Sequence, residues 1–139
     1  MKKRFLLIIL ILCIFLISGC EYTPTILHSP ETYDHDLWVG DIFFSEPIVL
    51  NQPNEIYVEI HNAGTYDETN VEVNFFANNE FIETKLINIS SGEMVILDFI
   101  FTPMACGDQI LSINITPVLG EEYINNNFRE EQTRIPKIT

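Results

Sequence analysis

Basic residues are scarce in this chain of 139 residues. Seven Lys and Arg residues stand against 20 Asp and Glu residues, for a formal net charge of −13. A protein this acidic repels phosphate backbones and anionic lipid headgroups, so we expect no nucleic acid among its partners. Long single-sign charge blocks are also missing, and the acidic residues alternate with apolar ones. The composition is that of a folded acidic domain, not of a disordered tail.

Cysteine is scarce as well. The three cysteines lie at positions 13, 20 and 106, and the first two belong to the N-terminal segment described below. Cys106 therefore has no disulfide partner in the remainder of the chain, so the apolar core has to hold the fold alone. The sequence around Cys106 contains neither a Cys-x-x-Cys motif nor a neighbouring basic residue, so nothing there indicates an activated thiol. We expect Cys106 to be a small buried apolar residue.

Residue combinations that support catalysis are missing too. The chain has three histidines and no glycine-flanked serine that would form a nucleophile elbow. We predict no enzymatic activity and no cofactor. The segment Tyr33-Asp34-His35-Asp36 places a histidine between two carboxylates, but it has the character of a solvated linker end, and we predict no metal site there. The acidic and Asn-rich segments 67–68, 121–122 and 125–127 offer oxygen ligands for Ca²⁺, but hydrogen bonds from these side chains to nearby backbone, which support turns, explain them well enough.

Only one long apolar run is present, and it lies at the N-terminus. Lys2-Lys3-Arg4 precedes an apolar stretch of 13 residues from Phe5 to Ile17, followed by Ser18-Gly19-Cys20. A basic head, a short apolar stretch and small residues before a cleavage point are typical of a secretory signal peptide. The stretch is shorter than the ~20 residues of a membrane-spanning helix. An uncleaved membrane anchor that reaches Cys20 is the alternative.

The cysteine that ends this segment resembles the acceptor of a lipoprotein signal. The resemblance implies that residues 1–19 are removed, that Cys20 carries lipid, and that the protein stays on the extracytoplasmic side of a membrane in the cell envelope. Without the signal, four basic residues stand against 20 acidic ones, for a charge of −16. Residues 20–35 contain Pro24 and Pro30 and no sustained periodicity, so we predict a lipid-attached linker.

Short alternating runs occupy the rest of the chain. Apolar residues recur at every second position, and turn residues separate the runs. The runs are centred on residues 37–44, 56–60, 71–75, 81–86, 95–101, 111–115 and 128–135. A change of parity across Gly40-Asp41 indicates a β-bulge. No run shows a sustained helical period. We predict an all-β domain over residues 36–136, an immunoglobulin-like antiparallel β-sandwich of two sheets with about seven strands.

Six segments in the same order and spacing resemble CARDB, the cell adhesion related domain found in bacteria. They are Asp36-Leu37-x-Val39, Asn62-x-Gly64-Thr65, Ile87-x-Ile89-Ser90-Ser91-Gly92, Leu97-x-Phe99-x-Phe101-Thr102-Pro103, Gly107-x-x-x-Leu111-x-Ile113-x-Ile115-x-Pro117 and Glu122-x-x-Asn125-Asn126-Asn127. Phe101 replaces a frequent tryptophan, and Met104-Ala105-Cys106 replaces a small, polar hairpin. The resemblance covers residues 36–128 and implies a sandwich used for extracellular binding or spacing, without catalytic activity.

The strand order of such a sandwich predicts which side chains face inward. We expect Leu97, Phe99 and Leu111 to be almost fully buried. The first, second and middle strands then share a sheet whose outer face presents Trp38, Tyr57, Ile96 and Ile100, the predicted binding surface. The linker or the C-terminal segment folding over this face is the alternative. The opposite sheet presents a mostly polar face, made of Glu72, Asn74, Ser112 and Asn114 apart from Phe76 and Ile110.

Three classes of function remain at this stage. The first is a lipid-tethered, non-catalytic module that binds a protein or glycan in adhesion. The second is a structural or accessory subunit of an envelope complex for secretion, transport or the surface layer. The third is an enzyme or solute-capture lipoprotein, which so small a sandwich disfavours because it has little room for a cleft. Asn88-Ile89-Ser90 and Asn114-Ile115-Thr116 match the acceptor motif for N-glycosylation.

Overall fold

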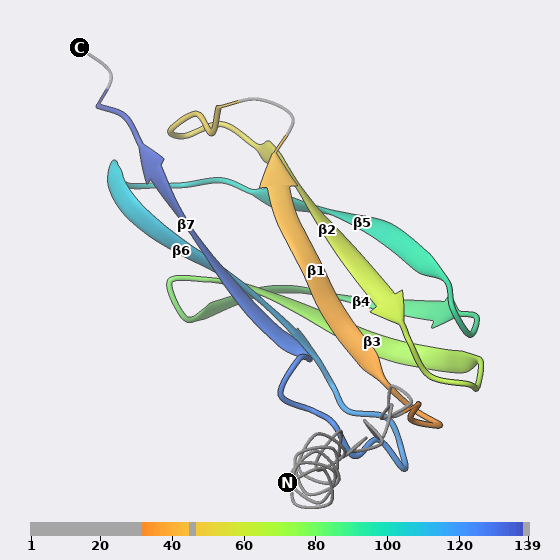
Figure 1. Ribbon diagram of the computed structural model, residues 1–139. Coiled ribbons are helices and arrows are strands. Elements are labelled where there is room, and N and C mark those ends of the chain that lie inside the picture. The colour runs from red at the N-terminus through yellow and green to blue at the C-terminus, as the bar shows by residue number, and fades with distance from the viewer. Residues whose placement is uncertain (1–31, 45–46, 138–139) are drawn as a thin grey trace, which may run out of the picture. The chain divides into compact units, whose positions relative to one another are not determined.

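Seven strands form two antiparallel sheets (Figure 1). The structure is a computed structural model that describes residues 32–44 and 47–137, all of them within one compact unit, Glu31–Thr139. The strands are β1 (Leu37–Phe44), β2 (Asn54–Asn62), β3 (Glu68–Ala77), β4 (Glu80–Ile89), β5 (Met94–Phe101), β6 (Gly107–Ile115) and β7 (Phe128–Ile135). One sheet has the order β1-β2-β5 and the other the order β4-β3-β6-β7. This confirms the predicted all-β sandwich and the predicted sharing of one sheet by β1, β2 and β5.

Turn chemistry explains where the strands end. Asn78 and Asn79, between β3 and β4, both have positive φ, at 51° and 65°. Two successive residues with positive φ make the tight turn that matches the twist of a hairpin, and asparagine tolerates that conformation better than most residues. Gly92 has a φ of 73° in the turn between β4 and β5. Both turns lie where the sequence predicts them.

A bulge shifts the register of β1 against β2. Val39 pairs with Ile60, whereas Ile42 pairs with Val58, so two residues of β1 lie between successive pairs. The bulge lets Val39 and Ile42 both face the core despite their odd spacing. At Gly40 a Cβ would lie 2.8 Å from the Cβ of Glu59, so the close approach of the strands requires glycine. The predicted bulge is confirmed.

The core lies between the two sheets. Strands β1, β2, β3, β5 and β6 each contribute two or more buried apolar residues, whereas β4 and β7 contribute one each, Ile89 and Ile135. Phe75 of β3 and Phe99 of β5 face one another with ring centroids 5.2 Å apart, and the edge of Phe101 packs against Phe75 at 6.4 Å. Phe99 and Leu111 are 0% exposed, as predicted. Eighteen buried apolar residues form this single cluster.

Leu97 is half-buried, so the prediction of its full burial is wrong. The reason is that β5 is an edge strand, which faces the edge strand β4 of the other sheet, and the core thins at this open side. Lys85 of β4 spans it instead. Its Nζ atom donates a hydrogen bond to Asp98 Oδ1 at 3.1 Å and lies 5.3 Å from the centroid of the Phe99 ring. The alkyl chain of a lysine covers apolar surface while its charge stays in solvent.

Cys106 is exposed, which contradicts the expected burial. It lies in the connection between β5 and β6, next to Met104 and Ala105, which are exposed as well. An irregular connection runs over the surface because buried backbone groups would lack hydrogen-bond partners. A connection that departs from the family sequence thus carries the thiol to the surface.

The connection between β6 and β7 covers the outer edge of β1. The Leu37 amide donates to Glu121 Oε1 at 2.8 Å, and the Val39 amide donates to the carbonyl oxygen of Asn126 at 3.0 Å. Asp36 Oδ1 also accepts a hydrogen bond from Asn126 Nδ2 at 2.9 Å. Pairing the amides at the start of an edge strand prevents another chain from adding to it there.

Candidate interaction surfaces

All four residues of the predicted binding surface lie on the sheet formed by β1, β2 and β5, whose outer side we call the three-strand face. Ile96 and Ile100 are 52% and 46% exposed, whereas Trp38 and Tyr57 are half-buried. Trp38 pairs with His61 across β1 and β2, and Tyr57 pairs with Asp98 across β2 and β5. The register therefore brings the four residues onto one face, as predicted from alternation.

Aromatic stacking explains why Trp38 and Tyr57 are half-buried. The Trp38 ring stacks on the imidazole of His61, with centroids 3.8 Å apart and an interplanar angle of 9°. Phe43 stacks on Tyr57 at 5.6 Å. Each pair fixes the orientation of its rings, so little side-chain freedom is left to lose on binding. Sequence reasoning missed Phe43 and Met94 on this face, although Met94 has the same parity as Ile96, and Phe43 has the right parity once the bulge in β1 is counted.

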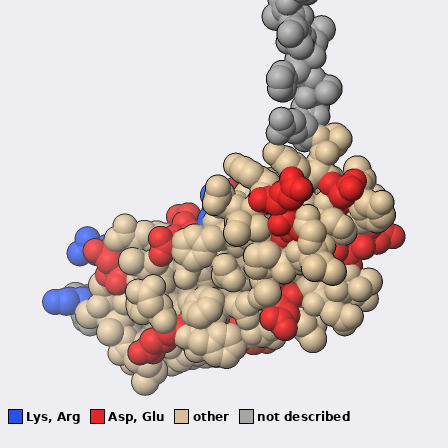
Figure 2. Space-filling model, turned by 90° about the horizontal axis from the view of Figure 1, so that it is seen from below, with Lys and Arg blue, Asp and Glu red and all other residues tan. Residues whose placement is uncertain are grey.

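Carboxylates separate the apolar residues of the three-strand face. Glu59 pairs with Ile96, and Glu55 pairs with Ile100. Asp98 forms an ion pair with Lys85, and the hydrogen bond from that lysine lowers the pKa of the Asp98 carboxyl. The three-strand face therefore combines apolar side chains with negative charge. Seen from below the view of Figure 1, acidic side chains are also scattered over the molecule, and basic ones are few (Figure 2).

The outer side of the other sheet, the four-strand face, is more apolar than predicted. Phe76 and Ile110 lie on it as expected, and three further residues were missed: Phe81, Leu86 and Phe128. Phe81 meets Phe76 edge-to-face at 5.8 Å because a register shift after Phe75 places the two rings opposite one another. Ser112, expected on the surface, is only 4% exposed. A shallow hollow of about 300 Å³ is lined by Phe76, Asn79, Ser112, Asn114 and Phe128.

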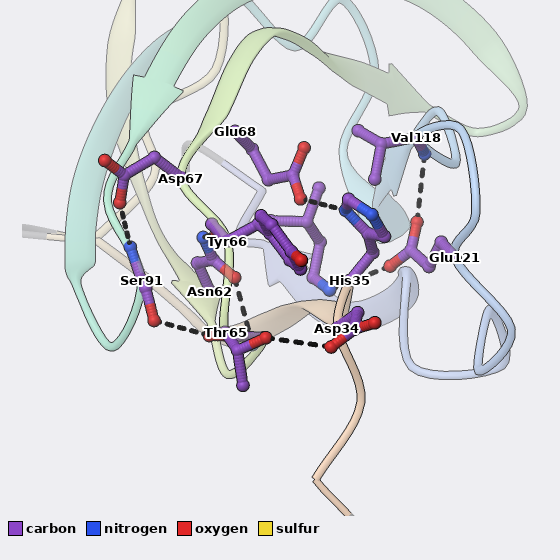
Figure 3. A network of polar contacts seen from close by, with 12 residues as sticks. Asp34, His35, Asn62, Thr65, Tyr66, Asp67, Glu68, Ser91, Val118 and Glu121 are labelled. Atoms are coloured by element: carbon purple, nitrogen blue, oxygen red, sulfur yellow. Dashed lines mark hydrogen bonds and ion pairs between the residues drawn. The ribbon is translucent and has the colours of Figure 1, made fainter.

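A polar network occupies the end of the sandwich where β1 begins (Figure 3). His35 Nδ1 lies 2.6 Å from Glu68 Oε1, and the imidazole stacks on Tyr66. Asp67 Oδ1 accepts a hydrogen bond from the Ser91 amide at 2.8 Å, and Asp34 Oδ1 accepts one from the Thr65 hydroxyl at 3.0 Å. Tyr33, Asp34 and His35, assigned above to the linker, therefore contact the domain.

Glu121 joins the same end of the sandwich. Its carboxylate accepts hydrogen bonds from the Leu37 amide, from the Val118 amide at 3.1 Å and from Asn127 Nδ2 at 2.9 Å. Glu68 and Asp67 are likewise bonded to groups of the protein. Within residues 32–44 and 47–137, no three His, Cys, Asp or Glu side chains come together in a group that would hold a metal ion. These carboxylates support the turns of this end of the sandwich.

The remaining predicted sites differ in what surrounds them. Asn88 is exposed, and its Oδ1 atom accepts a hydrogen bond from the Asn70 amide at 2.9 Å. Asn114 is half-buried within β6, beside Phe128 of β7. Glycosylation of either asparagine stays a prediction.

Cys20, the signal segment and residues 20–31 of the linker lie outside the described residues. None of the described residues belongs to a helix with the length and apolar character to cross a membrane.

Comparison with solved structures identifies the same fold in other proteins. The CARDB domain of the PF1109 protein from Pyrococcus furiosus, solved in complex with di-metal ions, superposes with a TM-score of 0.66 at 22% identity over 78% of this chain and 95% of that chain. A solution NMR structure of the same domain gives 0.62 at 21% identity, covering 76% of this chain and 97% of that chain. A β-glucosidase from Erythrobacter marinus gives 0.57 at 13% identity, over 73% of this chain and 16% of that chain.

Comparison by sequence leads to the family. A search of curated proteins returned no match. The CARDB family model matches residues 34–129, which make up most of the chain and include strands β1 to β6. On this match, the chain belongs to the CARDB family.

Proposed function

We propose that this protein is a lipoprotein of the cell envelope, held on the extracytoplasmic side of a membrane, whose CARDB domain binds a partner without catalysing a reaction. Family membership supports an adhesion-related role, and the lipoprotein-like N-terminus supports the tether. The observation that carries the binding role is the three-strand face, where large apolar side chains stand exposed on an otherwise acidic domain. Exposed apolar groups of this kind mark interaction sites in soluble proteins.

The chemistry of the three-strand face favours a protein as its partner. Its apolar residues are separated by carboxylates, so no continuous apolar strip is available for a lipid tail. A partner that supplies apolar side chains between Lys or Arg residues would match both features. Trp38 is the strongest candidate for an anchor, because tryptophan is enriched among residues that dominate binding energy and its ring is already held by His61.

The tether is tested by replacing Cys20 with alanine. The thiol is the proposed acylation site, so Cys20→Ala should leave a full-length precursor that incorporates no labelled fatty acid. Precursor and mature forms are separated by mass spectrometry after labelling in a lipoprotein-processing host. Cys13→Ala is the matched control and should be processed like the wild type. Normal cleavage and acylation of the Cys20 variant would show that the anchor lies elsewhere.

The binding face is tested by the double substitution Trp38→Ser and Ile100→Ser in the full-length chain. Loss of a central tryptophan anchor typically costs at least about 2 kcal/mol of binding energy, so we expect binding to envelope fractions of the source cell to fall about thirtyfold or more. The melting temperature should change little because both side chains lie outside the core.

Leu86→Ser is the matched control, since Leu86 is exposed on the opposite sheet. It should retain wild-type binding. Equal binding by the double variant and the wild type would refute this face as the contact surface. A large loss of stability in the double variant would assign the face to internal packing instead.

A further inference from the structure

We propose that the hollow on the four-strand face is a binding site for a neutral saccharide, the end of a glycan chain. Its lining residues are Phe76, Asn79, Ser112, Asn114 and Phe128, from β3, the β3–β4 turn, β6 and β7. The hollow belongs to the four-stranded sheet, whereas the proposed protein contact lies on the three-stranded one. The two sites are therefore separate, and each is testable without the other.

The polar groups of the hollow have no partners among the described residues, in contrast to their neighbours. On the same face, Thr84 donates to Asn74, Asn74 donates to Thr116, and Thr116 donates to Glu72, so these side chains form a continuous hydrogen-bonded chain. The side chains of Asn79, Ser112 and Asn114 form no hydrogen bond with any residue in the described ranges.

Ser112 is the most informative of the three. It is 96% buried yet lines the hollow, and it pairs directly with Phe76 across β3 and β6. An apolar ligand seated here would cover the hydroxyl and leave it unpaired, which is unfavourable. A ligand with its own hydroxyl groups would pair with it instead.

Two aromatic rings supply the other half of the site. Phe76 is held edge-to-face by Phe81, with an interplanar angle of 72°, and Phe128 is 49% exposed beside Asn114. A pyranose ring presents C–H groups on its face and hydroxyl groups around its rim. The C–H face suits a phenylalanine ring, and the rim suits amide and hydroxyl groups that both donate and accept hydrogen bonds. The hollow contains both kinds of group within one small space.

Charge and size narrow the ligand further. No charged side chain lines the hollow, although the domain as a whole is strongly acidic. A sugar that carries carboxylate or phosphate groups would be repelled by this field. The volume of about 300 Å³ lies at the lower end of the range for ligand pockets, roughly 300–1,000 Å³, and suits the end of a chain better than a folded polypeptide.

The saccharide is assigned to a separate molecule, not to a glycan attached to Asn114. Acceptor asparagines lie in surface loops, whereas Asn114 is half-buried inside β6, with Asn74 on one side and Phe128 on the other. A sugar attached to Asn114 would have to pass between the side chains of Asn74 and Phe128 to reach solvent. An external chain end approaches from solvent without that constraint.

Calorimetric titration of the full-length chain tests the site. The protein is made in a host without N-glycosylation, kept in a detergent without a sugar headgroup, and titrated with tetrasaccharides of glucose and of N-acetylglucosamine. We expect millimolar or tighter binding of at least one of them. Phe128→Ala should weaken it at least tenfold, and Ser112→Ala by about three- to tenfold through loss of hydrogen bonds. Neither change should lower the binding measured for the three-strand face.

Leu86→Ala serves as the control on the same face, and a tetrasaccharide of glucuronic acid serves as the charged control. Leu86→Ala should bind the neutral sugar as tightly as the wild type does. The wild type should bind the charged sugar more weakly than the neutral one. Failure of both neutral sugars to bind overturns the proposal, as does equal binding by Phe128→Ala. Equal affinity for the charged sugar overturns the neutral specificity. A glycan found on Asn114 in protein from its own source, by intact mass, overturns the external ligand.

Discussion

Replacing Phe99 with alanine is expected to unfold the domain or nearly so. Phe99 is fully buried between the sheets, and its ring packs against Phe75 and beneath Lys85. Truncation of a buried phenylalanine typically costs about 3–5 kcal/mol, because the lost contacts leave a cavity that the rigid sheets do not fill. That is a large part of the roughly 5–15 kcal/mol that stabilises a domain. Urea denaturation followed by circular dichroism measures the loss.

Two substitutions on the same strand serve as controls for Phe99→Ala. Leu97→Ala removes a half-buried side chain on the same side of β5 and should cost clearly less. Ile96→Ala removes an outward side chain and should change stability by about 0.5 kcal/mol or less. If Ile96→Ala proved the more damaging change, the register of β5 would differ by one residue from the one described, since such a slip exchanges the two faces of a strand.

Replacing Glu121 with alanine is expected to produce the second largest effect, about 3 kcal/mol of lost stability. The carboxylate accepts hydrogen bonds from two backbone amides and from the Asn127 side chain. Hydrogen bonds to a charged group contribute about 1.5–3 kcal/mol each, and the losses do not add fully because they share one side chain. Amide hydrogen exchange at Leu37 should accelerate more than exchange in the centre of β6.

Glu122→Ala is the matched control, since it removes an exposed neighbouring carboxylate. It should leave both stability and exchange close to the wild type. Glu121→Gln should fall between the two, because an amide keeps one acceptor oxygen but loses the charge. Equal effects of the Glu121 and Glu122 alanine variants would show that the hydrogen bonds of Glu121 do not support the start of β1.

Alternation and turn residues predicted the strands well because both are local signals. The last strand was predicted from Phe128 to Ile135 and is observed there, although its polar residues outnumber its apolar ones. The bulge at Gly40-Asp41 was also visible, since a change of parity appears directly in the residue order. The immunoglobulin-like order then predicted that the first, second and middle strands share a sheet, which is observed for β1, β2 and β5.

Properties that depend on position within a sheet were not predicted. Leu97 has the same alternation as Phe99, but only the arrangement in space reveals that its part of β5 faces the open side of the core. The hollow depends on the mutual register of three strands, because Phe76, Ser112 and Phe128 lie far apart in sequence. Alternation assigned Ser112 to the outer face correctly. It gave no indication that Ser112 would line a hollow together with Phe76 and Phe128.

The connection between β6 and β7, which covers the outer edge of β1, also determines how late in folding that edge becomes protected. Leu37 and Glu121 are separated by 84 positions, and Asp36 and Asn126 by 90. The first strand of the sandwich in chain order is thus protected only after nearly the last residues of the domain are in place. Sandwiches that depend on such distant pairings fold within milliseconds to seconds, more slowly than helical domains. During that interval the unprotected strand is available to other unfolded copies of the chain, and intermolecular mispairing competes with completion of the native sheet.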